Sequence, residues 1–283
     1  MHYATEKDRT GLFSIESWLV QRKLSHLKAY WGTKPLSFGG AGYTDVMRCK
    51  VHQAYHEACF PHPVWIPQQC HGSQVQWLDA PLSQEQWQCL AQATDGVLTS
   101  CLRLPIGVLT ADCVPVLLAC REGRFVGAVH AGWRGVANRI VPEAVALLET
   151  RFSDAVSTLE VYLGASAQAY HYRVDTPVIE ALVLSLPSSL GSLGVPEAEE
   201  MYKDDTSTQW YYPVETPSAS KPEFHVSLHE VLTQQLIALG VSADAIVKNP
   251  QCTIAHECHD LTWSHRRGDT ERMLHSIWLD AVR

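Results

Sequence analysis

The chain has 283 residues, 46% of them hydrophobic, which suits a globular protein with a sizeable core. Its net charge is −8 without any basic run, and no apolar stretch is long enough for a membrane span or a signal peptide, so neither nucleic acid nor a membrane is an expected partner. Nine irregularly spaced cysteines do not indicate a disulfide framework in a chain this long, so we expect a cytoplasmic protein whose thiols are free to act as ligands or nucleophiles.

The first hundred residues give only short predicted elements. Residues 1–36 are mixed in character, with a helix-compatible patch around 15–27 that we do not assign further, and a glycine loop follows at 38–42. Helices are predicted at 45–59 and 81–91, and strands at 64–66, 75–78 and 95–99. His71 lies in a glycine-containing turn between two of these strands, a position from which functional side chains are often displayed.

Residues 106–151 form the most informative stretch. Strands are predicted at 106–110, 116–120 and 125–130, followed by a helix at 136–150. If Cys120 pairs with Phe125 across the polar turn, the ladder places His130 opposite Pro115 and makes Cys113 its diagonal neighbour on the same face. Such a diagonal spans roughly 7–8 Å between backbones, so a thiol and an imidazole converge at two strand ends.

The rest of the chain alternates strands and helices. We predict strands at 159–163, 245–253, 261–264 and 273–279, and helices at 178–186 and 225–239, the second ending at Gly240. Residues 187–222 are rich in Ser, Pro and acidic residues and contain Trp210-Tyr211-Tyr212. We predict a surface loop there, with a flexible flap carrying an aromatic patch as the alternative. Because we find no internal repeat or linker, residues 1–283 are predicted to form one domain.

Three sequence blocks carry a resemblance to a known family. His71-Gly72-Ser73-Gln74-Val75, Thr110-Ala111-Asp112-Cys113-Val114-Pro115 and His130-Ala131-Gly132-Trp133-Arg134-Gly135 resemble the signature blocks of the YfiH/laccase-domain family. Weaker echoes are Phe38-Gly39-Gly40, Asp95-Gly96-Val97-Leu98-Thr99, Cys252-Thr253 and Ser264-His265-Arg266-Arg267. The resemblance runs from about Phe38 to the end and implies an α/β (α+β) fold, a single domain of mixed β-sheets flanked by helices.

The resemblance also implies a metal and a chemistry. In the family, residues at the positions of His71, Cys113 and His130 bind one zinc. Two imidazoles and a thiolate are ligands that zinc prefers, and they leave a fourth position open. Copper is less expected, because the chain has no His-x-His of the kind that multicopper sites use.

The family is described as purine nucleoside enzymes, so a nucleoside and phosphate are the expected partners of a monomer or weak homodimer. The expected reactions are adenosine deamination and phosphorolysis of adenosine, inosine or methylthioadenosine. Zinc activates water at neutral pH, which is the chemistry that nucleobase deaminases use with similar ligands.

Three residues are candidate catalytic groups, and two of them have a plainer alternative. Asp112 faces away from Cys113; it either orients a ligand histidine or carries a proton, or it is a buried turn acceptor. Arg134, just before the predicted helix at 136–150, is either a phosphate clamp assisted by the helix N-terminus or a packing residue. Arg266 is a further anion-binding candidate, as is Arg267.

A second group of possible ligands lies near the C-terminus. Cys252, His256, Cys258 and His259 are close in sequence and raise the possibility of a second zinc. Their spacing lacks the paired C-x-x-C order of a structural site, so we predict a loop with incidental thiols.

The chain departs from the family pattern around the expected substrate pocket, at Ala165, Arg173, Ser227, Leu232 and Glu271. Two alternatives therefore stay open beside the nucleoside enzyme. One is a thiol hydrolase with Cys113 as nucleophile and His130 as base, including the peptidoglycan-precursor editing linked to bacterial relatives. The other is a non-catalytic relative with a drifted pocket.

Overall fold

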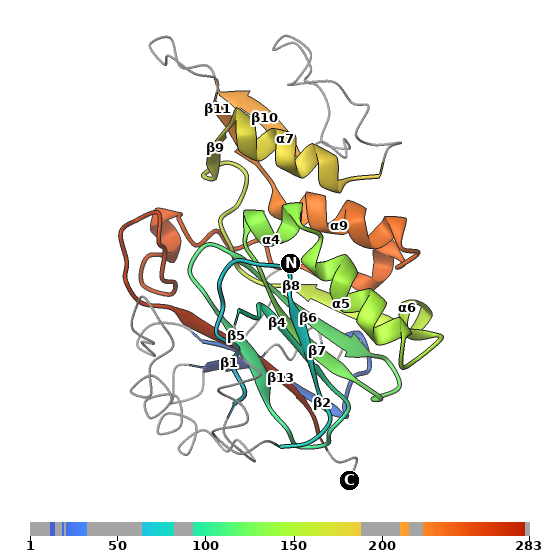
Figure 1. The fold of residues 1–283 in the computed structure, drawn as a ribbon. Coiled ribbons are helices and arrows are strands. Elements are labelled where there is room, and N and C mark those ends of the chain that lie inside the picture. Colours follow the sequence, from blue (N-terminus) through green and yellow to red (C-terminus); the bar gives the residue numbers. More distant parts are fainter. Residues whose placement is uncertain are drawn as a thin grey trace.

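The structure, a computed structural model, describes residues 12–14, 19, 21–32, 64–81, 93–187, 210–214 and 223–280. The predicted loop at 38–42, the predicted helix at 45–59 and nearly all of the one at 81–91 lie outside these residues. The described part is a mixed α/β fold with several sheets flanked by helices, as expected (Figure 1).

A six-stranded mixed sheet forms the centre of the fold. Its order is β12-β8-β6-β7-β4-β3, with the strands β3 Val75–Leu78, β4 Gly96–Thr99, β6 Val114–Cys120, β7 Val126–Ala131, β8 Leu159–Leu163 and β12 Ile246–Lys248. Every residue of β6 and β7 is buried, which explains why these strands read as continuous apolar runs. The predicted hairpin register is confirmed, since Cys120 N–H donates to the Phe125 carbonyl and Pro115 pairs with His130.

A second sheet packs against one face of the first. Its order is β1-β2-β13-β5, with β1 Leu12–Ser14, β2 Leu27–Gly32, β5 Ile106–Thr110 and β13 Met273–Leu279. Leu117 and Ala128 of the central sheet share a buried cluster with Ile106 and Ile277 of this second sheet. Because side chains alternate along a strand, Pro115 and His130 lie on this same face, near the end of the ladder between β6 and β7.

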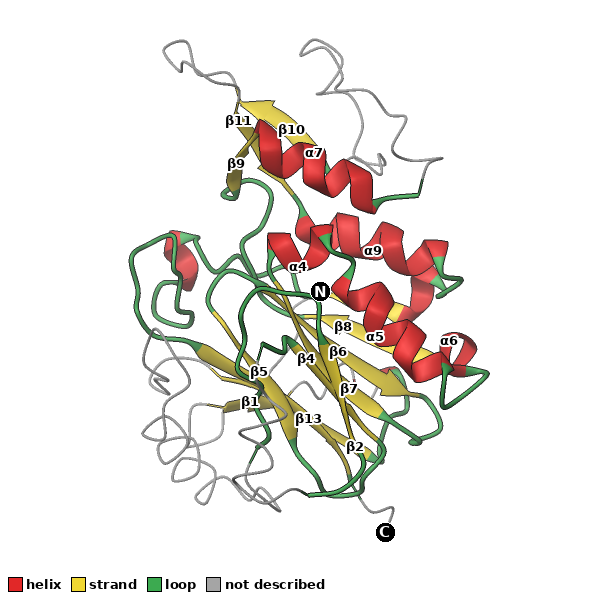
Figure 2. Ribbon diagram, in the orientation of Figure 1, coloured by secondary structure: helices red, strands yellow, loops and turns green. Residues whose placement is uncertain are grey.

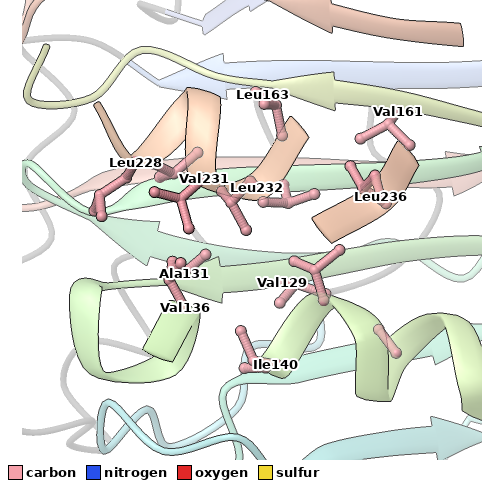
Figure 3. Close-up of a cluster of buried hydrophobic side chains, with 14 of the residues drawn as sticks. Val129, Ala131, Val136, Ile140, Val161, Leu163, Leu228, Val231, Leu232 and Leu236 are labelled. Carbon is pink, nitrogen blue, oxygen red and sulfur yellow. The ribbon is translucent and has the colours of Figure 1, made fainter. Parts of the chain in front are cut away.

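Helices cover the other face of the central sheet (Figure 2). The helices are α4 Trp133–Ala137, α5 Ile140–Glu149, α6 Ala155–Thr158, α7 Thr176–Ser185 and α9 Leu228–Ala238, with short 3-10 helices η2 at Ala243–Ala245 and η3 at His256–Cys258. Val136 of α4 and Leu232 of α9 belong to the same buried apolar cluster as Val129 of β7 and Leu163 of β8 (Figure 3). Of the helices described, none is long and apolar enough to cross a bilayer.

A third, small sheet corrects the prediction for residues 187–222. It has the order β10-β11-β9, with β9 Arg173–Asp175, β10 Tyr211–Val214 and β11 Glu223–Val226. Trp210 and Tyr211 are buried in the main apolar cluster, so this aromatic pair is core rather than a surface patch. The remaining residues of the predicted loop, 188–209 and 215–222, lie outside the described part.

Two predicted helices have different limits in the structure. The helix at 136–150 is two helices, because Arg139 adopts a left-handed backbone conformation (φ 59°) between α4 and α5. The helix at 225–239 starts at Leu228, because His225 pairs in β11 and Ser227 accepts a hydrogen bond from Glu230 N–H as the N-cap.

Three predicted strands are shorter or missing. Residues 245–253 keep only β12, which pairs with β8 in parallel. The prediction at 261–264 is wrong, because Thr262 N–H and its hydroxyl both turn back to the Cys258 carbonyl. At 64–66 only Trp65 pairs, in an isolated bridge with Ile106.

Candidate metal centre

Three side chains from separate parts of the chain meet where the inner strands β6 and β7 of the central sheet begin and end. His71 comes from the turn before β3, Cys113 from the turn between β5 and β6, and His130 from β7. One potential ligand atom from each lies within 4.8 Å of the other two. Cys113 Sγ is 3.8 Å from His71 Nε2, and the two imidazole rings stand nearly perpendicular, with centroids 4.7 Å apart. The arrangement could hold one metal ion.

The strand register delivers two of these groups, and a glycine makes room for the third. The ladder between β6 and β7 ends at Val114 and Ala131, one residue before Cys113 and Gly132 would face each other. A Cβ at Gly132 would lie 3.0 Å from both Cys113 Sγ and His71 Cδ2, closer than ordinary van der Waals contact. Gly132 therefore allows the turn that carries His71 to approach the hairpin.

Asp95, directly before β4, fixes the two histidines with one buried carboxylate. Its Oδ1 accepts hydrogen bonds from His130 Nδ1 at 2.8 Å and from His71 N–H at 2.9 Å. Its Oδ2 accepts from Gly72 N–H at 2.8 Å, and from the N–H and the thiol of Cys70 at 3.1 and 3.2 Å. The His71 backbone, held at a φ of 62°, thus gains partners that offset its unfavourable conformation.

The electrostatics of this cluster follow from burial and proximity. Burial would raise the pKa of Asp95, but the hydrogen bond from His130 and the backbone N–H groups lower it to about 2. Burial opposes charge on Cys113 and His130 as well, yet each favours the charge of the other, so the pKa of the thiol falls to about 6 and that of the imidazole rises to about 9. The thiol is therefore readily available as a thiolate, the form that binds metals.

Asp95 is the residue that sequence reasoning missed. In the sequence it is only part of the turn into a predicted strand and of a weak family echo. The signal that would have found it is the pairing of β4 with β7, in which Gly96 lies opposite Val129 and places Asp95 beside His130. His130 N–H also donates to the Asp95 carbonyl at 2.7 Å. A carboxylate that accepts from a ligand histidine fixes its ring orientation and tautomer.

Asp112 has partners other than the histidines. It has a φ of 85°, and its buried carboxylate accepts from Thr253 Oγ1 at 2.6 Å and from Arg266 N–H at 2.7 Å. Within the described residues, its hydrogen bonds go to these two loops and not to His71 or His130. The geometry agrees with the turn-acceptor alternative and ties two distant loops to the residue beside Cys113.

The three candidate arginines differ in what they contact. Arg266 is exposed, with its Cζ 5.0 Å from the centroid of the Tyr172 ring. Arg267 is committed to the protein, because it donates to the carbonyls of Thr253 and Thr262 and pairs with Asp269 at 2.9 Å.

Arg134 lies inside α4, with its Cζ 4.4 Å from the Trp133 ring centroid. The predicted position before a long helix is wrong, because the chain breaks at Arg139 and α4 has only 5 residues. The contribution expected from the N-terminus of a long helix therefore does not apply to Arg134.

The second group of cysteines and histidines does not converge. Cys252 Sγ accepts from Gln168 N–H at 3.3 Å and lies 3.4 Å from His171 Nδ1. Exposed His256 and His259 lie beside each other, with ring centroids 6.4 Å apart. Among the residues that the structure describes, His71, Cys113 and His130 are the group of three that meets the geometry for a metal ion.

Four of the five departures from the family pattern have local structural roles. Ser227 is the N-cap of α9, where its side chain accepts a hydrogen bond from Glu230 N–H. Leu232 is buried in the apolar cluster of Figure 3, and Arg173 pairs with Glu223 at 3.5 Å. Ala165 is buried in the cluster between the two large sheets. These contacts account for the four residues without a change in the metal centre.

Comparisons with known proteins show which family the chain belongs to. Residues 44–280 match the model of a family described as multi-copper polyphenol oxidoreductase laccase. A purine nucleoside phosphorylase of Xylella fastidiosa (strain 9a5c) is 31% identical over 205 residues, which cover 72% of this chain and 67% of that protein. The purine nucleoside phosphorylase YlmD of Geobacillus stearothermophilus is 30% identical over 241 residues, 83% of this chain and 79% of the relative.

Solved structures show the same fold. The crystal structure of YlmD from Geobacillus stearothermophilus superposes with a TM-score of 0.74 at 24% identity, covering 98% of this chain and 99% of that one. YfiH from Bacillus licheniformis gives a TM-score of 0.71 at 20% identity, with 98% and 99% covered. The family match and these relatives show that the chain belongs to the YfiH/laccase-domain family.

Proposed function

We propose that this protein is a zinc-dependent purine nucleoside phosphorylase in which His71, Cys113 and His130 hold one zinc ion. The observation that carries the proposal is the convergence of these three ligand atoms within 4.8 Å. Relatives with about this fold and 30–31% identity are named purine nucleoside phosphorylases, which supports nucleoside and phosphate as substrates. Adenosine deamination at the same centre is the second expected reaction.

The residues present fit zinc better than copper. Two imidazoles and one thiolate form a donor set that zinc accepts in catalytic sites, where three protein ligands leave one position for substrate or water. Asp95 occupies the Nδ1–H of His130 and so directs Nε2 toward Cys113. When bound, zinc would supply a Lewis acid that stabilises developing negative charge.

The other side chains of the site would bind phosphate for the phosphorolysis reaction. In phosphorolysis, a phosphate oxygen forms a bond to C1′ of the ribose while the bond from C1′ to the purine nitrogen breaks. The electron pair leaves with the purine, which takes up a proton. Arg266 and Arg134, both exposed and near aromatic rings, are the two candidate groups for binding the phosphate. Asp112 would hold the Arg266 backbone in place.

One observation favours a second candidate function. Cys113 and His130 bring their sulfur and nitrogen atoms within 4.8 Å of each other, and this proximity lowers the pKa of the thiol to about 6 and raises that of the imidazole to about 9, which favours a thiolate–imidazolium pair of the kind found in thiol hydrolases. A hydrolase of this type would retain activity in the presence of a chelator and would be labelled at Cys113 by an electrophile.

The test combines metal analysis with a substrate panel. Purified protein is analysed for zinc and incubated with adenosine, inosine and methylthioadenosine, with and without phosphate, and products are read by mass. The proposal expects one zinc per chain and free base with ribose 1-phosphate (methylthioribose 1-phosphate from methylthioadenosine) only when phosphate is present, both lost in Cys113→Ala. Activity that persists in a chelator, or bound nucleoside without any product, would contradict it.

A further inference from the structure

Two neighbouring arginines, Arg266 and Arg267, have opposite surroundings. The Arg267 guanidinium donates to the Thr253 and Thr262 carbonyls and pairs with Asp269. Arg266 is exposed, and in the described part of the chain no carboxylate forms an ion pair with it. An arginine without an acidic partner keeps its planar fork of N–H donors for a ligand.

The position of Arg266 is nevertheless fixed at two points. Its backbone N–H donates to Asp112 Oδ2 at 2.7 Å, next to the candidate ligand Cys113. Its guanidinium carbon lies 5.0 Å from the centroid of the Tyr172 ring, within the range of a cation–π contact. A ring beneath the guanidinium restricts the side chain, which lowers the entropy lost when an anion binds.

Tyr172 connects this arginine to the metal centre. Its side chain is buried, and its backbone is held by Gln168 and Val226 on either side. The turn that carries it is tied to the residue beside Cys113, because Ala167 N–H donates to the Asp112 carbonyl at 2.9 Å.

We propose that Arg266 and Tyr172 form the phosphate-binding subsite beside the metal centre, with Tyr172 positioning the guanidinium. The inference rests on the proposed phosphorolysis for its biological role, but binding of inorganic phosphate can be measured without turnover. Phosphate suits the site because a planar guanidinium binds two of its oxygens at once. Arg134 is the less suitable arginine, because its ring partner is Trp133 on its own short helix, whereas the Arg266 backbone is bonded to Asp112 beside Cys113.

The experiment measures phosphate binding to the zinc-loaded protein by calorimetry, using inorganic phosphate as the titrant. Arg266→Ala removes a charge-assisted contact, so the Kd for phosphate should rise about 10- to 100-fold. Tyr172→Leu removes the ring and should raise the Kd about 3- to 5-fold, while Tyr172→Phe keeps the ring and should give a smaller change. Zinc content should stay at the wild-type level in all three variants.

Arg103→Ala is the matched control, since it removes one exposed positive charge elsewhere on the surface and should leave the Kd unchanged. An unchanged Kd in Arg266→Ala, or a rise in Arg134→Ala alone, would overturn the proposal. If Tyr172→Leu unfolds, Tyr172→Phe still tests the hydroxyl and Arg266→Ala the subsite.

Enzyme assays separate this inference from the proposed function. Phosphorolysis with an unchanged KM for phosphate in Arg266→Ala would refute the subsite and keep the function. Phosphate binding that depends on Arg266 in a protein without phosphorolysis would keep the subsite and refute the function. For Tyr172→Leu, a positioning role predicts a higher KM for phosphate with a smaller change in kcat.

Discussion

Two regions of this protein carry cysteines and histidines, and only one of them gathers those side chains around a common point. His71, Cys113 and His130 lie far apart in sequence and converge within 4.8 Å. Cys252, His256, Cys258 and His259 are close in sequence, yet in the described part of the chain they do not form a group that could hold a metal ion. Proximity in sequence is therefore a poor guide to a metal site in this chain.

The difference has a physical cause in each region. In the first, a hairpin register and a glycine bring the donors together, and the buried Asp95 carboxylate orients both histidine segments. In the second, a short 3-10 helix leaves His256 and His259 exposed, and the Cys252 thiol is engaged by Gln168 N–H. The following experiments test this contrast, from the largest expected effect to the smallest.

The largest effect is expected from exchanging a thiol in each region. Cys113→Ala removes one of three ligands, so zinc content should fall from one per chain to nearly none. Cys258→Ser, the matched change in the second region, should leave zinc content unchanged. Elemental analysis of both purified proteins after exhaustive dialysis gives the result. Equal zinc loss in the two variants would mean that the second region also binds the metal.

Acid should weaken the fold through His229, which anchors the second region. Its Nε2 lies 3.0 Å from the Gly164 carbonyl and 3.0 Å from Ser166 Oγ, and Ser166 pairs with Cys252. Burial lowers the pKa of His229 from its ordinary value of 6.5 to about 4. Below pH 6.5 the unfolded chain binds a proton that the folded imidazole takes up only near pH 4, so stability is full above pH 6.5 and falls as the pH decreases.

This loss should reach on the order of 3 kcal/mol by pH 4. Urea unfolding of the wild type and of His229→Gln between pH 7 and pH 4 isolates the contribution, because glutamine can donate to Gly164 without titrating. The pH dependence should be flatter in the variant. Parallel curves for the two proteins would show that His229 does not titrate as proposed.

Asp95→Asn tests the buried carboxylate that orients the histidines of the first region. The amide keeps the size of the carboxylate but loses its charge and one acceptor, so His130 is less firmly oriented. Zinc affinity should fall about 10- to 100-fold, as for other partners of ligand histidines. Competition with a chromophoric chelator measures this, with Asp79→Asn as a control for loss of an exposed carboxylate. An Asp95→Asn variant that binds zinc with wild-type affinity would show that Asp95 is not needed to orient His130.

Asp112→Asn should have the smallest effect on the metal. The side chain connects the two regions by accepting from Thr253 and Arg266, without contacting the candidate histidine ligands in the described residues. Replacing one oxygen by an N–H donor leaves a buried donor facing the Arg266 N–H, which should cost about 1–3 kcal/mol of unfolding free energy. Thermal unfolding measures the cost, and zinc content should remain at one per chain. Loss of zinc would instead favour a direct role in metal binding.

The sequence predicted the parts of the site that depend on local patterns. Alternation along β6 and β7 and the polar turn between them were enough to place His130 opposite Pro115. The contribution of Asp95 required knowing that β4 pairs with β7, and strand pairing over such a distance is not visible in a single sequence.

Other differences arose where tertiary packing overrides local pattern. Arg139 adopts a left-handed conformation that divides an apparently continuous helix, with its guanidinium donating to the Ser185 carbonyl. Trp210 and Tyr211 were read as part of a polar loop because their neighbours are polar, but pairing between β10 and β11 buries them. In both cases the deciding partners come from distant parts of the chain.

X-ray absorption at the zinc edge of the purified, zinc-loaded protein tests the central claim most directly. The account predicts two nitrogen ligands and one sulfur ligand, with a zinc–sulfur distance of about 2.3 Å, and one further light-atom ligand. The sulfur contribution should vanish in Cys113→Ala and persist in Cys252→Ser. A wild-type spectrum with two or more sulfur ligands, or with none, would contradict a centre built from His71, Cys113 and His130.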